Sequence, residues 1–258
     1  MTFKGRRPIL LALAVILITG AARIPLEARI EQDLIDNRFR DGTPGLELRE
    51  QLGQMGFVAA FGGFRSLVAS VLDMLAFVSY SNQEWGEVDS RYALICRLQP
   101  RLIKYWDLAS WHMAYNAVAY YTHRNPATEH LRQAVKDRLV AGYVERGKEY
   151  LEQGLTFVPE AGELHTRLAE IYRKLDPNPP KAAEHYLQAY QHSGSEHLER
   201  AYAYELVKCS ERSRWEKAYE VLCRHLKDAS NPLSLTRDLK NLEERLQIPF
   251  MLRVSENR

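Results

Sequence analysis

The sequence predicts an all-α protein, and three observations carry this prediction. Apolar residues recur at helical spacing from about residue 62 to residue 247, and no stretch alternates polar and apolar residues long enough for a strand. Hydrophobic residues make up 46% of the 258 residues and charged residues 26%, which is enough apolar surface for a packed core. Pro159, Gly194 and Ser230 end helical segments at intervals of 35 and 36 residues, which indicates a repeated unit.

Charge and cysteine content exclude two classes of protein. The 35 Lys and Arg residues nearly balance the 33 Asp and Glu residues, so the net charge of +2 supplies no strongly basic face for nucleic acid. The cysteines, Cys96, Cys209 and Cys223, are too few for a disulfide-dense scaffold. We therefore expect no nucleic-acid partner.

The first predicted element is an N-terminal membrane helix. Lys4, Arg6 and Arg7 precede an uncharged run over residues 8–22, which ends at Arg23. A helix of fifteen residues spans about 22 Å, less than the roughly 30 Å of a hydrocarbon core, so its length is at the lower limit for crossing. Basic residues before an apolar run stay cytoplasmic, which predicts a single-pass protein of the bacterial inner membrane with its body outside the cytoplasm.

The same run also fits a cleaved signal peptide, because small residues lie near its end at positions 19–22. We favour an uncleaved signal-anchor over residues 1–25. Residues 26–61 follow as a juxtamembrane helical stalk, since Leu26, Ile30, Leu34 and Phe39 lie at roughly helical spacing.

Residues 57–80 form a second apolar stretch that contains Arg65 and Asp73. Each charge costs about 2.5–3.5 kcal/mol near the centre of a bilayer. We therefore expect a largely buried helix here, and a second membrane span is the alternative.

The body, residues 62–232, divides into helical hairpins. The third unit is the clearest: a large residue is followed by Leu, a small residue and Tyr at +3, +4 and +7, and a second helix repeats a small–large–small pattern. These residues are His165, Leu168, Ala169, Tyr172, Ala182, Tyr186 and Ala189. Small residues let helices approach closely, and large residues fill the gaps between neighbouring hairpins.

The other hairpins follow in order. The first covers about residues 72–100 and the fourth about residues 196–230. Between Pro100 and Pro159 the second contains about 25 residues more than one repeat of about 34, which we place around residues 120–138. A helix over residues 233–246 then caps the array, and residues 233–258 form the cap and tail.

This pattern resembles the tetratricopeptide repeat (TPR). The N-terminal half is also similar to membrane-anchored bacterial repeat proteins, through residues 62–65 (GGFR), 98–101 (LQPR) and 106–116 (WDLASWHMAYN). The resemblance implies an α-solenoid of about four TPR-like hairpins behind an N-terminal anchor. It implies no enzymatic chemistry.

Motifs for catalysis are missing from the sequence. It contains no phosphate-binding loop, no G-x-S-x-G elbow, no HExxH and no CxxC. We expect no catalytic residues, no cofactor and no metal. Cys209 with Cys223 and His225 allows a metal site or a disulfide as the alternative to small buried thiols.

The aromatic segment of residues 105–121 is the best candidate for a binding surface. In TPR arrays the first helix of each hairpin lines the concave surface, which implies that Trp111 and Tyr115 face a groove with charged residues beside them. Such aromatic anchors dominate binding energies at protein interfaces. The predicted partner-binding set is Asp73, Phe77, Tyr80, Lys104, Asp107, Trp111, Tyr115, Glu170, Arg173 and Lys174.

The sequence thus predicts a membrane-anchored scaffold that binds a protein or peptide partner, within a bacterial envelope or secretion assembly. One alternative is a subunit that forms homo- or hetero-oligomers through residues 129–157, where Gly142 and Gly147 permit close helix approach. Another is an enzyme subunit with its pocket inside the superhelix. An exposed apolar stripe on the long helix would favour the first alternative, and a buried Glu or His with a strongly shifted pKa the second.

Overall fold

The computed structural model describes residues 63–123, 125–228 and 232–255. Within these ranges the regular structure is entirely helical, with no strand, which confirms the predicted all-α class. The elements are α3 (Arg65–Ser81), α4 (Trp85–Leu98), α5 (Ile103–Trp111), the π-helix η3 (His112–Ala117), α6 (Val118–Thr122), α7 (Gln133–Phe157), α8 (Gly162–Lys174), α9 (Pro179–Ser193), α10 (Glu196–Lys208), α11 (Arg212–Asp228), α12 (Pro232–Arg245) and the 3-10 helix η4 (Phe250–Leu252).

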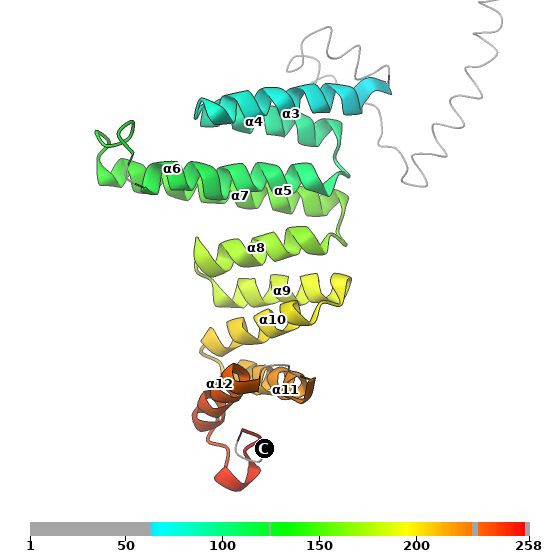
Figure 1. Cartoon of the computed structure of the whole chain (residues 1–258), viewed down its shortest axis with the longest axis vertical. Coiled ribbons are helices and arrows are strands. Elements are labelled where there is room, and N and C mark those ends of the chain that lie inside the picture. The colour runs from blue at the N-terminus through cyan, green and yellow to red at the C-terminus, as the bar shows by residue number, and fades with distance from the viewer. Residues whose placement is uncertain (1–62, 124, 229–231, 256–258) are drawn as a thin grey trace, which may run out of the picture.

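The helices stack in chain order (Figure 1). Helices α3 and α4 lie at one end and α12 at the other, and each helix packs against its neighbours in the sequence. Helix α5 also contacts α8, although α7 lies between them in the sequence. Residues far apart in the sequence therefore meet on one face of the stack.

The core follows the spacing of small and large residues seen in the sequence. It is divided into clusters along the stack, which are centred on α3–α8, on α8–α10 and on α10–α12. Six of the seven pattern residues of the third unit are buried, with exposed fractions of 4% or less: Leu168, Ala169, Tyr172, Ala182, Tyr186 and Ala189. The seventh, His165, is partly exposed.

Helix α9 shows how local sequence sets helix boundaries. The Asn178 side chain accepts a hydrogen bond from the backbone N–H of Lys181, and Pro179 occupies the first turn. The helix ends at Gly194, whose φ of +67° is the left-handed conformation that glycine adopts most easily. The predicted role of Gly194 as the end of this segment is confirmed.

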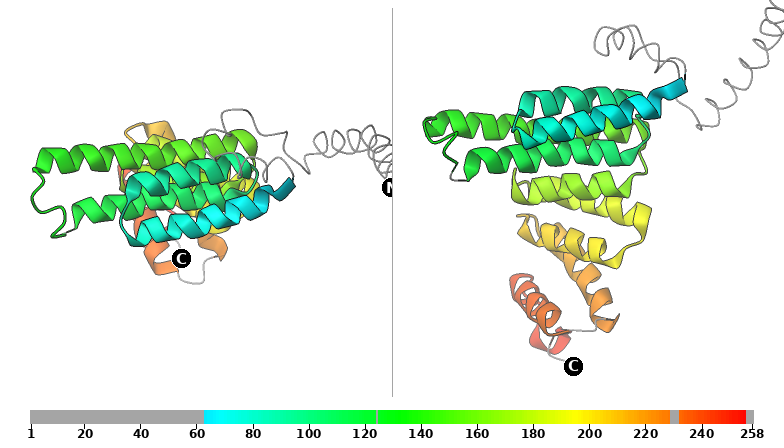
Figure 2. Two further views of the ribbon diagram at one scale, coloured as in Figure 1. Left: turned by 90° about the horizontal axis from the view of Figure 1, so that it is seen from above. Right: turned by 45° about the horizontal axis from the view of Figure 1, so that its top comes forward.

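The pair formed by the α5–η3–α6 run and α7 is longer than the helices on either side of it. Elements α5, η3 and α6 form one continuous helical run, and α7 contains 25 residues. Figure 2 shows α6 and the start of α7 projecting beyond the rest of the stack. The extra residues were predicted in this region, but they lengthen both helices as well as the loop between them.

Glycines allow α7 to pack closely against the run before it. A Cβ atom added to Gly147 would lie 2.6 Å from the Cβ of Ala114, and one added to Gly154 would lie 2.8 Å from Trp106. Gly147 therefore serves packing within the chain, whereas Gly142 has nothing within 4 Å. The exposed large apolar residues of α7 are Val135 and Phe157, which do not form a stripe.

The expectation of a largely buried helix over residues 57–80 is wrong for its described part. Helix α3 buries only Ala69, Ala76 and Ser79. It packs on α4 through small residues, and no described element covers its opposite face, which leaves Leu67, Val71, Met74, Phe77 and Val78 exposed.

Among the described residues, no helix combines the length and apolar character needed to cross a membrane. The predicted anchor (residues 1–25) and stalk (residues 26–61) lie outside the described residues.

Candidate functional site

An apolar groove lies between α3 and the run formed by α5 and η3. It has a volume of about 600 Å³ and contains two of the predicted binding residues, Asp73 and Phe77. The Phe77 side chain is 66% exposed, and Asp73 accepts a hydrogen bond of 2.9 Å from the Tyr92 hydroxyl. The other lining residues are Met74, Leu75, Val78, Tyr92, Leu108 and His112.

Next to this groove, α5, η3 and α8 form a cluster of stacked aromatic rings and an arginine. The rings of Trp111 and Tyr115 stack with centroids 4.6 Å apart and an interplanar angle of 19°. The Arg167 guanidinium lies 4.9 Å from the Trp111 ring centroid and 5.9 Å from that of Tyr115. Both rings therefore have a cation beside them, which is a favourable arrangement for aromatic faces.

Two carboxylates hold this arginine in place. Arg167 Nε donates to Asp107 Oδ1 at 2.8 Å, and Arg167 Nη1 donates to Glu170 Oε2 at 2.9 Å. Burial lowers the pKa of the Arg167 guanidinium. The hydrogen bond and charge of Asp107, with the other partners, outweigh this effect, so the pKa lies above its ordinary value. A cation fixed in this way needs no reordering when a ligand arrives.

The cluster remains accessible and incompletely satisfied. Trp111 is 39% exposed. The Tyr115 hydroxyl is buried; the Arg167 side chain interacts with it, but no described group forms a hydrogen bond of regular geometry with it. Burial raises the pKa of Tyr115, so the side chain is a neutral phenol at pH 7.

The structure brings together six of the ten predicted binding residues, in two neighbouring sets. Asp73 and Phe77 line the groove, while Asp107, Trp111, Tyr115 and Glu170 form the cluster with Arg167. We call these residues the α3–α8 face.

The other four predicted residues do not belong to the α3–α8 face, but Tyr80 and Arg173 border it. The Tyr80 ring lies 6.3 Å from the Phe77 ring, 5.9 Å from Trp85 and 4.9 Å from His112 between centroids, and the charge of Arg173 acts on the Tyr115 hydroxyl. Lys104 is exposed beside the Tyr105 ring, and Arg173 and Lys174 are exposed at the end of α8.

Sequence reasoning missed Arg167, the residue at the centre of the cluster. The available signal was its position three residues before Glu170, which is the spacing of an ion pair on one helix. Its second partner, Asp107, is 60 residues away, and only the packing of α5 on α8 brings it near.

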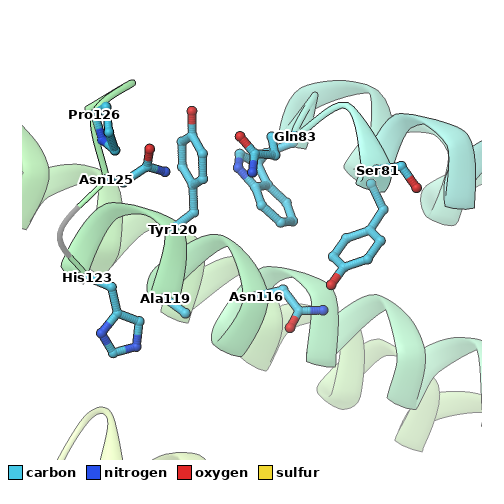
Figure 3. Close-up of a pocket in the computed structure, with 10 residues that line it drawn as sticks. Ser81, Gln83, Asn116, Ala119, Tyr120, His123, Asn125 and Pro126 are labelled. Atoms are coloured by element: carbon cyan, nitrogen blue, oxygen red, sulfur yellow. The ribbon is translucent and has the colours of Figure 1, made fainter. Parts of the chain in front are cut away.

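Sequence reasoning also missed a polar pocket beside the projecting end of the second pair of helices. It has a volume of about 530 Å³ and lies between the α3–α4 turn and α6 (Figure 3). One wall consists of residues that belong to the 25-residue excess.

The cysteine and histidine candidates for a metal site have other environments. His225 Nε2 lies 2.7 Å from Glu199 Oε2, and all three cysteines of the chain are free thiols. In the described part of the chain, no group of three or more His, Cys, Asp or Glu residues is arranged to hold a metal ion.

Two histidines on α8 and α9 form a neutral pair. The Nδ1 atoms of His165 and His185 lie 3.0 Å apart, so one ring donates to the other. Burial, with the charges of His165 and Lys181, lowers the pKa of His185 to about 4. His185 therefore has a strongly shifted pKa, but its hydrogen-bond partner is a second histidine.

Comparison of the sequence with known proteins found no matching family model and no matching curated protein.

Proposed function

We propose that this protein is a membrane-anchored helical-repeat scaffold that binds a segment of a partner protein on the α3–α8 face. One observation carries this proposal: a stacked pair of aromatic rings, of which Trp111 is exposed, lies with a fixed arginine beside an apolar groove. Aromatic and arginine side chains are enriched at the energetic centres of protein interfaces.

The partner that suits this face is a short peptide segment with two apolar anchors. One anchor fills the groove of about 600 Å³, and the other packs on the Trp111 ring. Because Asp107 and Glu170 hold Arg167 in advance, binding costs less conformational entropy than it would on a mobile surface.

The proposed architecture is an α-solenoid of TPR-like hairpins. The pairs are α3 with α4, the α5–η3–α6 run with α7, α8 with α9, and α10 with α11, and α12 caps the end. Burial of the pattern residues Leu168, Ala169, Tyr172, Ala182, Tyr186 and Ala189 supports the resemblance. In such an array, hairpins stack to bury a continuous core and leave one face free for ligands.

Membrane attachment is part of the proposal and is based on the sequence alone. Residues 8–22 are uncharged and follow three basic residues, so we propose that residues 1–25 anchor the chain with its body outside the cytoplasm. The full chain should remain in the membrane fraction after carbonate extraction. Protease added to spheroplasts should digest its body. A soluble chain that begins downstream of residue 22 would replace the anchor by a cleaved signal peptide.

Crosslinking mass spectrometry on native membranes tests the binding face. We compare the wild-type chain with the double variant Trp111→Ala/Tyr115→Ala and with Phe250→Ala as a matched control. Phe250 is 63% exposed and lies near the other end of the stack. Residues that act as energetic centres cost about 2 kcal/mol or more on truncation, or roughly 30-fold in affinity.

The expected result is that specific crosslinks to the α3–α8 face disappear in the double variant and persist in Phe250→Ala. Far-UV circular dichroism must show that both variants remain folded. Crosslinks that persist unchanged in the folded double variant would rule out this face as the binding site.

A further inference from the structure

The polar pocket between the α3–α4 turn and α6 has the composition of a ligand site. Its volume of about 530 Å³ lies within the usual range of small-molecule pockets. Figure 3 shows Tyr120 between Asn125 and Gln83, with Asn116 one turn earlier on the same helical run. The remaining lining residues are Tyr80, Ser81, Trp85, Ala119, His123 and Pro126.

An unsatisfied donor lines this pocket. Trp85 is 5% exposed, and its indole N–H is buried without a hydrogen-bond partner among the described residues. Two other indoles in the stack, one buried and one partly buried, do have partners: Trp106 donates to the Pro100 carbonyl and Trp215 to the Cys209 carbonyl, each at 2.7 Å. Leaving such a group unpaired in the protein interior is unfavourable, so a ligand acceptor here would stabilise the bound state.

The backbone around the pocket is also unusual. Asn116 lies in the π-helix η3, and π-helical turns occur frequently at functional sites. Gln83, in the α3–α4 turn, has a φ of +62°, which is uncommon for a residue other than glycine. Strained conformations of this kind cluster at sites that bind ligands.

The lining residues indicate the chemistry of the ligand. Among the described residues that line the pocket, none is Lys, Arg, Asp or Glu, so their chemistry favours a ligand held by hydrogen bonds over one held by ion pairs. Asn116, Asn125 and Gln83 supply amides, each of which offers both donors and acceptors. Hydroxyl groups also donate and accept, and a sugar ring adds an apolar C–H face that suits an aromatic ring.

We propose that this pocket binds a neutral saccharide. A hydroxyl oxygen of the sugar accepts the hydrogen bond from the Trp85 indole, and neighbouring hydroxyls exchange hydrogen bonds with the amides of Asn116, Asn125 and Gln83. The ring packs against Tyr120. This inference does not depend on the proposed function, because the pocket shares no residue with the α3–α8 face.

The indole resonances of the four tryptophans report on the pocket directly. The full ¹⁵N-labelled chain, in a detergent without a sugar headgroup, is titrated with glucose, N-acetylglucosamine and maltose, and separately with adenosine and a neutral tripeptide. A Trp85→Phe variant assigns the Trp85 signal. We expect at least one saccharide to shift the Trp85 indole proton saturably, while the signals of Trp106 and Trp215 stay in place.

Affinities of variants then test the contacts. By calorimetry, Trp85→Phe and Asn116→Ala should each weaken binding of that saccharide about tenfold, which corresponds to one lost hydrogen bond. Trp111→Phe, on the α3–α8 face, is the matched control and should bind normally. The proposal is overturned if no saccharide shifts the Trp85 signal at 50-fold excess, if only adenosine or the tripeptide does, or if Trp85→Phe binds as tightly as the wild type.

Discussion

Two arginine networks in the stack share the same geometry of charges but use their aromatic side chains differently. In each network an arginine Nε donates at 2.8 Å to an aspartate from an earlier helix, and a terminal nitrogen donates at 2.9 Å to a glutamate three residues further on. The two sets are Asp89, Arg146 and Glu149, and Asp107, Arg167 and Glu170.

The first network is closed by its tyrosine. Tyr150 is 1% exposed, and its hydroxyl donates to the Asp89 carbonyl at 2.8 Å and accepts from Arg146 at 3.3 Å. In the second network, the Tyr115 hydroxyl forms no hydrogen bond of regular geometry with a described group, and Trp111 is 39% exposed. The comparison teaches that one arrangement of charges holds the core together at α4 and α7, and presents an open aromatic surface at α5 and α8.

Truncation of the aromatic residues should show the largest difference between the networks. We expect Tyr150→Ala to lower the free energy of unfolding by about 3–5 kcal/mol, because it leaves a cavity in the core. Trp111→Ala should lower it by about 1 kcal/mol or less, because the side chain is partly exposed. Urea unfolding of the full chain in mild detergent, followed by circular dichroism, measures both. Equal losses would mean that Trp111 is a core residue and that the second network is not open.

Alanine substitutions at Gly147 and Gly142 test how closely α7, which contains Arg146 and Tyr150, packs against η3. Gly147 lies between Arg146 and Tyr150, and a Cβ atom there would lie 2.6 Å from Ala114, so Gly147→Ala should cost about 1–3 kcal/mol. Gly142→Ala meets open space and should gain up to about 1 kcal/mol from helix propensity. The same unfolding experiment measures the pair, and a neutral Gly147→Ala would show that α7 is not held close to η3.

Removing only the hydroxyl groups sharpens the comparison. Tyr150→Phe loses the hydrogen bonds of the hydroxyl to Asp89 and Arg146 and should lower the free energy of unfolding by about 1–2 kcal/mol. Tyr115→Phe removes a buried hydroxyl that forms no hydrogen bond of regular geometry with a described group, and it should be neutral or slightly stabilising. If Tyr115→Phe is as destabilising as Tyr150→Phe, the Tyr115 hydroxyl is satisfied and the networks are equivalent.

The last comparison depends on pH and concerns the His165–His185 pair, in which the contact is between neutral groups rather than charges. Burial lowers the pKa of His185 to about 4, against about 6.5 in the unfolded chain, so the unfolded state binds more protons between these values. The contribution to stability is therefore complete above about pH 6.5 and is lost as the pH falls toward 4. We expect His185→Asn to lose less stability than the wild type between pH 7 and pH 4.5.

Thermal unfolding at the two pH values measures this difference. The control is His130→Asn, since that side chain is exposed and lies outside the pair. If His185→Asn and the wild type lose equal stability, the His165–His185 pair does not affect the pH dependence.

Sequence spacing was sufficient for elements whose cues are local. The end of α9 could be predicted because Gly194 is a residue type that adopts positive φ easily. The burial of Leu168 and Ala169 could be predicted from helical periodicity. The exposed face of α3 did not follow, because periodicity identifies an apolar stripe but not whether another element covers it. Arg167 was missed for a related reason, since its partner Asp107 is distant in the sequence.

The sequence by itself determined the all-α class, the boundaries of several helices and the aromatic residues of the candidate site. These depend on helical periodicity, on glycine and proline at helix ends, and on residue type, all of which act over a few neighbouring positions. Only the tertiary structure decided that Arg167 lies beside Trp111, that Trp85 keeps an unpaired N–H in a polar pocket, and that Gly147 contacts Ala114. Each of these depends on which helices pack together, and helices that are 20 to 60 residues apart in the sequence meet only after the stack has formed.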